Sequence, residues 1–169
     1  MRAGMLPPWG LARERVIRLL DGAQARVRPV RARCRGCGRT HVVLPAWCAP
    51  RRAHGTGVIA AAAGAALDGT GHRVIAVRLG VPAATVRGWL RRLRAQAEPL
   101  RCHAMRQLAV FDPHAQPPGP ARPPLGDALA ALAAAVHAAR CRLGGGPDLI
   151  WPLLGALGLG LFLVPAPSG

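Results

Sequence analysis

The chain has 169 residues and a formal net charge of +16, and all 23 of its basic side chains are Arg. This length fits one domain or two small ones. The charge is uneven, because residues 1–106 carry 20 Arg against four acidic side chains while residues 107–169 are balanced. A positive field confined to one part of the chain favours a polyanionic partner, with nucleic acid first and an anionic membrane surface second.

The composition argues against an enzyme. The seven carboxylates are spread along the sequence, unlike the clustered carboxylates of a two-metal nuclease or transposase core. The sequence has no phosphate-cradling Gly-rich loop and no nucleophile elbow. With two Phe, four Trp and no Tyr, it also lacks the stacking platforms of single-strand binders. Five Cys in no regular framework, and no long apolar run at the N-terminus, indicate a cytoplasmic protein.

The N-terminal third is expected to be irregular over residues 1–23, with an amphipathic stretch from Leu11 to Leu20, and then to form a small β-hairpin within residues 24–52. A strand over residues 24–34 has a phase shift at Pro29 and an Arg-lined face, which indicates an edge strand. A tight turn and a returning strand rich in β-branched side chains complete the hairpin.

From Thr56 the apolar spacing becomes helical, so residues 53–112 predict an α unit. Thr56 and Thr70 are expected to cap its first two helices, and Gly80 to end the second. The predicted helices are 56–67, 72–79, Ala83 to Ala97 and about 100–111. A Pro-rich linker follows over residues 113–124, and residues 125–169 predict an Ala-rich helix ending near Leu143 and an apolar C-terminal helix. The expected fold is mainly α.

The second and third predicted helices have the pattern of a helix-turn-helix. Ala76 is small where the two helices would cross, and Gly80 supplies the positive φ that the turn needs. One face of the third helix is apolar and would pack on the other helices, through Val86, Trp89, Leu90 and Leu93. The fold class is therefore a three-helix unit of this kind, preceded by a β-hairpin that is half of a zinc ribbon and followed by C-terminal helices.

The opposite face of the helix from Ala83 to Ala97 predicts readout of the major groove of double-stranded DNA. Arg can bond bidentately to guanine and Thr can approach the methyl group of thymine, so Thr85, Arg87 and Arg91 are the candidates for base contacts. The candidates for phosphate contacts lie nearer the helix ends and are Arg73, Arg92 and Arg94. Both a monomer and a homodimer fit this pattern. The alternative is a three-helix bundle whose Arg residues form a solvated face.

The pair Cys34 and Cys37, followed by Gly38, resembles one knuckle of a zinc ribbon. A tetrahedral site needs two more ligands, and residues 1–33 contain neither Cys nor His. The downstream substitutes are His41, Cys48 and His54. The pattern therefore fits either a structural zinc site or a metal-free, incomplete knuckle, and no cofactor is assigned. A chain purified from residue 1 is expected to hold well under one zinc.

The apolar run from Leu149 to Val164 has no charged residue and is shorter than the roughly 20 residues of a spanning helix. We expect it to pack on the Ala-rich helix. The alternative is a membrane anchor with the basic part of the chain on the cytoplasmic side. The protein would then be a membrane-anchored basic protein that binds anionic lipid, or DNA near the membrane.

The stretch from Arg31 to His41 and the segment from Ile75 to Arg92 together resemble a family of actinobacterial proteins of unknown function. Its members have a zinc-ribbon-like N-terminus followed by a helix-turn-helix, and they are similar to the DNA-binding ends of some transposases. The resemblance covers roughly residues 15–110. It implies sequence-specific DNA binding, by a transcription regulator or a transposase-derived module, and no catalytic residue. Family members usually have a further C-x-x-C upstream, so its absence here indicates a start codon assigned too far downstream or a decayed copy.

Overall fold

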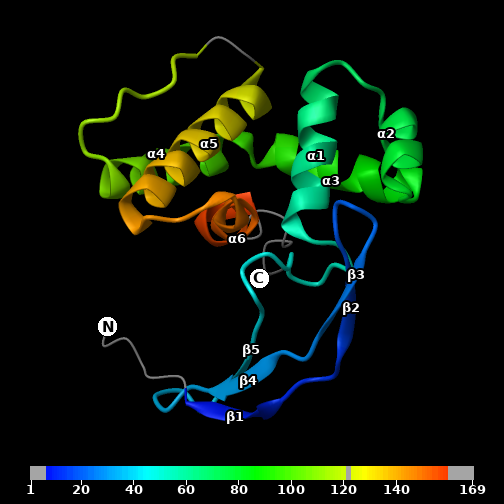
Figure 1. Cartoon of the computed structure of the whole chain (residues 1–169), viewed down its shortest axis with the longest axis vertical. Helices are drawn as coiled ribbons and strands as arrows, with labels where there is room; N and C mark the ends of the chain where they lie inside the picture. The colour runs from blue at the N-terminus through cyan, green and yellow to red at the C-terminus, as the bar shows by residue number, and fades with distance from the viewer. Residues whose placement is uncertain (1–6, 121–122, 160–169) are drawn as a thin grey trace.

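A computed structural model describes residues 7–120 and 123–159 of the chain. The helices gather at one end of the molecule, and the strands form an arm that curves away from them (Figure 1). The strands are β1 (Pro8–Leu11), β2 (Arg15–Arg18), β3 (Gln24–Val27), β4 (Val30–Arg33) and β5 (Thr40–Val43). The helices are α1 (Thr56–Leu67), α2 (His72–Leu79), α3 (Ala83–Ala95), α4 (Ala97–Phe111), α5 (Pro124–Leu143) and α6 (Ile150–Leu154).

The strands form two antiparallel groups, a β2–β3 ribbon and a three-stranded sheet in the order β1-β4-β5. The predicted hairpin is present as β4 and β5, joined by a turn in which the Gly38 N–H donates to the carbonyl of Cys34 at 2.9 Å. The predicted strand over residues 24–34 is instead two strands, because Pro29 interrupts it and β3 pairs with β2. The prediction of an edge strand is wrong for β4, which lies between β1 and β5, whereas β3 is an edge strand of the two-stranded ribbon.

The N-terminal segment contains two strands, β1 and β2, where the sequence indicated an irregular and amphipathic stretch. Only Ile17 within β2 is buried, so the apolar pattern there is too weak to show the period of two. Ile17 packs with Val27 of β3 and with Cys48 in a small core of their own. Residues 1–6 of the predicted segment lie outside the described residues.

The three helices α1, α2 and α3 have the bounds that the spacing predicts, apart from α3, which ends at Ala95 instead of Ala97. The predicted caps are wrong. Gly55 and Gly71 occupy the cap positions, and neither helix start has a side-chain cap. Thr56 is instead the first helical residue of α1 and is fully buried. Gly80 ends α2 in the left-handed conformation with φ 60°, as expected.

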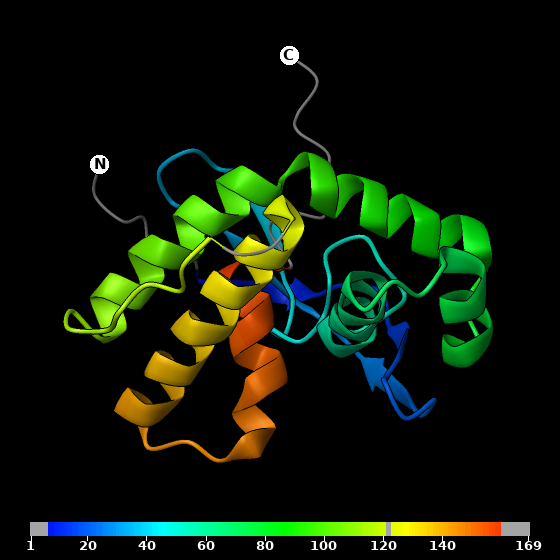
Figure 2. The same cartoon turned by 90° about the horizontal axis from the view of Figure 1, so that it is seen from above.

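The Ala-rich helix α5 lies along α4, as Figures 1 and 2 both show. Small side chains let these two helices approach closely, and one hydrophobic core joins them to α1, α2 and α3. The described residues of the predicted linker, 113–120 and 123, form no helix or strand. Residues 121 and 122 lie outside the described part.

The described portion of the apolar tail packs on the helices. Leu157 is buried in the main core, and α6 lies against both α5 and the start of α1. Among residues 7–120 and 123–159, no helix is long and apolar enough to cross a membrane. The last residues of the predicted apolar run, 160–164, lie outside the described range.

Candidate nucleic-acid interface

The helices α2 and α3 are joined by a tight turn at Gly80, Val81 and Pro82. The N–H groups of Gly80 and Val81 donate to the carbonyls of Val77 and Ala76, at 3.2 and 2.9 Å. These bonds close the end of α2, and the positive φ of Gly80 redirects the chain into α3. Ala76, predicted at the close approach of the two helices, is 5% exposed.

One face of α3 is anchored in the main core. This face consists of the predicted apolar residues, all buried: Val86, Trp89, Leu90 and Leu93. They belong to the same core as Ile75 of α2 and Val58 and Ile59 of α1. The predicted register of α3 is therefore correct, and it fixes which side chains point outward.

The outward face of α3 carries a row of exposed guanidinium groups. Arg87, Arg91 and Arg94 are exposed and follow one another at helical spacing. Thr85 and Arg92 flank this row and are half-buried, while Arg73 is exposed on α2. The helix α3 thus presents several guanidinium groups to solvent while its opposite face is packed in the core.

Arg92 differs from its neighbours because its side chain folds back along α3. Its guanidinium donates to the carbonyl of Gly88 at 3.3 Å. Arg52, from the loop before α1, lies close enough that burial and then the charge of Arg92 lower its pKa. Two guanidinium groups are thus held near each other beside α3, which strengthens the positive potential there.

The β2–β3 ribbon ends beside the α2–α3 turn, which the sequence did not predict. The guanidinium of Arg18, the last residue of β2, donates to the carbonyl of Gly80. The backbone of Arg18 also bonds to Ala53 and Gly55 before α1. These contacts fix one end of the arm of strands on the α2–α3 unit.

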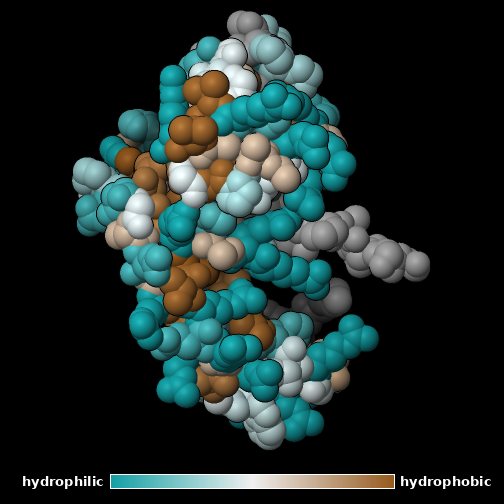
Figure 3. All heavy atoms as spheres, turned by 90° about the vertical axis from the view of Figure 1, so that its right-hand side faces the viewer, coloured by the Kyte–Doolittle hydropathy of each residue, from teal (hydrophilic) through white to brown (hydrophobic). Residues whose placement is uncertain are grey.

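The basic face of the ribbon carries Arg18 and Arg26, and it meets the α2–α3 turn through Arg18. Residues paired across an antiparallel ribbon share a face, and Val16 pairs with Arg26 while Arg18 pairs with Gln24. The other face carries Ile17 and Val27, which are buried. Figure 3 views the side on which α2 and the ribbon lie, where hydrophilic side chains are interspersed with hydrophobic ones.

His54 links the ribbon to the core of α3. Its ring meets the buried Trp89 indole edge-on, with centroids 5.1 Å apart. Burial, followed by the charge of Arg18, lowers the pKa of His54, which favours the neutral ring. It is therefore a packing group at this junction.

Cys34 and Cys37 lie at the far end of the arm, in the turn between β4 and β5. Hydrogen bonds from the backbone N–H and the thiol of Cys37, then from the N–H of Gly36, lower the pKa of Cys34. The substitute ligands are dispersed: His41 is exposed on β5, Cys48 is buried near Ile17, and His54 packs on Trp89. Within the described ranges, no group of three His, Cys, Asp or Glu side chains is placed to hold a metal ion.

The thiols of the arm are expected to react at different rates. Burial raises the pKa of Cys48 to about 11, whereas the pKa of Cys34 is lowered. Because the thiolate is the reactive species, we expect iodoacetamide at pH 8 to modify Cys34 at least about 100-fold faster than Cys48 in the folded chain. Peptide mapping by mass spectrometry measures both rates, and denatured protein is the control in which they converge. Equal rates in the folded chain would contradict this arrangement.

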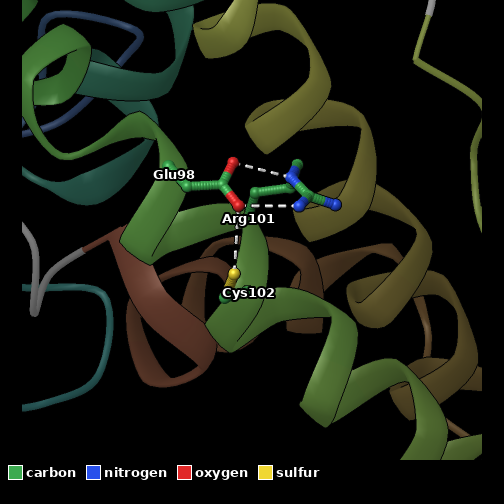
Figure 4. A network of polar contacts seen from close by, with 3 residues as sticks. All are labelled: Glu98, Arg101 and Cys102. Carbon is green, nitrogen blue, oxygen red and sulfur yellow. Dashed lines mark hydrogen bonds and ion pairs between the residues drawn. The ribbon is translucent and has the colours of Figure 1, made fainter.

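The start of α4 carries a polar network made by Glu98, Arg101 and Cys102 (Figure 4). The Glu98 carboxylate accepts bonds from the guanidinium at 2.7 and 2.8 Å and from the thiol at 3.2 Å. These bonds lower the pKa of Glu98 to about 2. The network makes a small contribution to the stability of the folded chain. This contribution is present above the ordinary pKa of Glu98, near 4.5, and is lost as the pH falls toward 2. Cys102 is half-buried, and its thiol is a donor in this network.

Residues 10–89 match the family model of DUF6431, a domain of unknown function. The match spans the arm of strands, α1, α2 and the first half of α3. It includes the Cys34–Cys37 turn and the α2–α3 turn, the two segments that carry the resemblance seen in the sequence. No curated protein and no solved structure matches the chain.

Proposed function

We propose that this protein binds double-stranded DNA, with α2 and α3 as a helix-turn-helix and α3 in the major groove. The observation that carries the proposal is the exposed row of Arg87, Arg91 and Arg94 on a helix whose opposite face is fully buried. A helix held in this way can enter the groove without losing its packing. The protein would act in the cytoplasm as a transcription regulator or a transposase-derived DNA-binding module.

The position of each side chain on α3 suggests its role. Thr85, Arg87 and Arg91 lie in the first two thirds of the helix, whose N-terminal part meets base edges in this mode of binding. Arg94 near the end of α3 and Arg73 on α2 are placed for phosphates. Arg92 is a phosphate ligand only if its guanidinium leaves the carbonyl of Gly88.

The basic face of the β2–β3 ribbon extends the proposed interface beyond α3. The arm exposes many Arg side chains, and they are Arg13, Arg15, Arg26, Arg28, Arg31, Arg33, Arg35 and Arg39. The bond from Arg18 to Gly80 keeps the ribbon next to the α2–α3 turn. Duplex DNA longer than the groove site would therefore meet the ribbon along its phosphate backbone.

Binding selection tests the proposal directly. The full chain is incubated with a pool of random-sequence duplexes, and the recovered sequences are compared after several rounds. We expect a recurring motif. We also expect the logarithm of the binding constant to fall linearly with the logarithm of the salt concentration, with a slope of about 0.9 per phosphate contacted. A pool without any motif would contradict groove readout, and tighter binding to anionic vesicles than to every duplex would support the lipid-binding alternative.

The ribbon contact has its own test. Replacing Arg26 with Ala is expected to weaken binding to all duplexes about equally and to reduce the salt slope by about one. Arg26 is paired with Glu14 at 3.2 Å, so Glu14→Gln is the matched control, and it should leave the affinity unchanged or increase it. Arg106→Ala on α4 is the second control, and it should leave DNA binding unchanged. If Arg26→Ala also leaves DNA binding unchanged, the ribbon does not touch DNA. That result would not contradict groove readout by α3.

A further inference from the structure

A cavity of about 580 Å³ lies on the ribbon side of the helices. Its walls come from the tip of the β2–β3 ribbon, the loop that carries Trp47, the start of α1, and the segment that carries Asp148 and Trp151. Ligand pockets commonly have volumes of roughly 300–1,000 Å³ and mostly apolar walls with a few polar groups. This cavity fits that description, and no step of the proposed DNA binding uses it.

Two tryptophans are brought to this cavity by contacts at the start of α1. The buried Thr56 hydroxyl lies 3.3 Å from the carbonyl of Trp47 and 3.1 Å from that of Trp151. A Cβ on Gly57 would meet the Trp151 ring at 3.1 Å, so the missing side chain gives the indole its place. Gly155 likewise lets the chain after α6 approach the backbone of Ala46 closely. The Trp151 indole is therefore placed by its packing on Gly57, and the backbone of Trp47 is bonded to the start of α1.

The ionisable side chains among the residues that line the cavity are two exposed carboxylates, Asp21 and Asp148. Neither forms an ion pair in the described part of a chain that carries 23 Arg residues. Asp21 accepts a bond from the N–H of Ala23 at 2.9 Å, which holds it at the tip of the ribbon. Two acidic side chains thus border a largely apolar space.

The start of α1 also borders the cavity, and a helix start favours anions through about half a positive charge. Three N–H groups at this helix start are engaged, however. The N–H groups of Gly55, Thr56 and Val58 donate to the carbonyls of Arg18, Trp47 and Gly55, at 2.9, 2.9 and 3.2 Å. The two carboxylates therefore decide the sign of the charge that the cavity prefers.

We propose that this cavity binds an organic cation, with an ammonium or amidinium group at Asp21 and Asp148 and an apolar body against Trp47 and Trp151. Indole faces attract cations, and carboxylates form charge-assisted hydrogen bonds with ammonium and amidinium groups. The proposal is independent of DNA binding, because none of the Arg residues on α3 lines the cavity.

Calorimetric titration of the DNA-free full chain with benzamidinium tests the site. We expect saturable binding of one benzamidinium per chain, much weaker binding of neutral benzyl alcohol and none of benzoate. Asp21→Asn and Asp148→Asn should each weaken benzamidinium binding by about threefold to tenfold. Neither change should alter the binding of benzyl alcohol, because the apolar walls remain.

Asp68→Asn is the matched control, since it removes one negative charge at an exposed position outside the cavity. It should leave benzamidinium binding unchanged. Absence of saturable binding would overturn the proposal. Binding of benzoate, or an equal effect of the variants at Asp21, Asp148 and Asp68, would overturn it as well. Because the titration contains no DNA, each of these outcomes leaves the proposed DNA-binding function standing.

Discussion

Trp89→Ala is expected to lower the free energy of unfolding by about 3–5 kcal/mol. Trp89 is fully buried where α1, α2 and α3 meet, and its indole also supports His54 and thus the junction with the arm. Removing it leaves a large cavity at the centre of the unit. Urea denaturation of the full chain, followed by circular dichroism, measures the change.

Trp89→Phe is the control for this prediction. Among the described residues, no acceptor takes the indole N–H of Trp89, so a smaller ring loses packing without breaking a hydrogen bond. We expect it to cost less than about 2 kcal/mol. If Trp89→Ala melts like the unmodified protein, Trp89 is not in the core and the register of α3 is wrong.

The helical part of the fold is predictable from sequence because its signals are local. The apolar spacing of α1, α2 and α3 repeats every three or four residues, and Gly80 marks the turn. The same spacing identifies the buried face of α3 and, by exclusion, the exposed arginines. The mainly helical character of the fold and the register of α3 therefore follow from residues close together in the chain.

The helix caps are not predictable in this way, because a distant segment decides them. The spacing at Thr56 is that of a capping residue, yet its hydroxyl lies between the carbonyls of Trp47 and Trp151. Trp151 is far along the chain and reaches α1 only when α6 packs. Gly55 occupies the cap position instead, with an extended backbone.

The arrangement of the strands also depends on long-range contacts. The sequence shows β4 as an Arg-rich strand that would sit at an edge, but β1 pairs with it through a register interrupted between Pro8 and Gly10. The docking of the ribbon rests on Arg18 and Gly80, which have no common sequence signal. The Arg-lined face of residues 24–34 is visible in the sequence, but it does not show which helices these strands approach.

The positions of the candidate DNA-contacting residues are predictable from the sequence, but the conformations of their side chains are not. All six candidates for DNA contact lie on α2 and α3, and the exposed ones among them are Arg73, Arg87, Arg91 and Arg94. The back-folding of Arg92 onto Gly88 was not foreseen, since a long side chain has several rotamers that spacing does not distinguish. The roles of these residues, and those of Cys34 and Cys37, stay predictions.

The sharpest prediction concerns the two ends of the exposed row on α3. Replacing Arg87 or Arg91 with Ala should cost about 1–3 kcal/mol of binding free energy on the selected duplex and relax sequence preference at one base pair. Arg94→Ala should instead weaken all duplexes alike and reduce the salt slope by about one. Affinities on matched and mismatched duplexes at several salt concentrations separate the two effects, and Arg106→Ala on α4 should show neither. A uniform loss from Arg91→Ala and Arg94→Ala alike would mean that α3 lies along the phosphate backbone and reads no base.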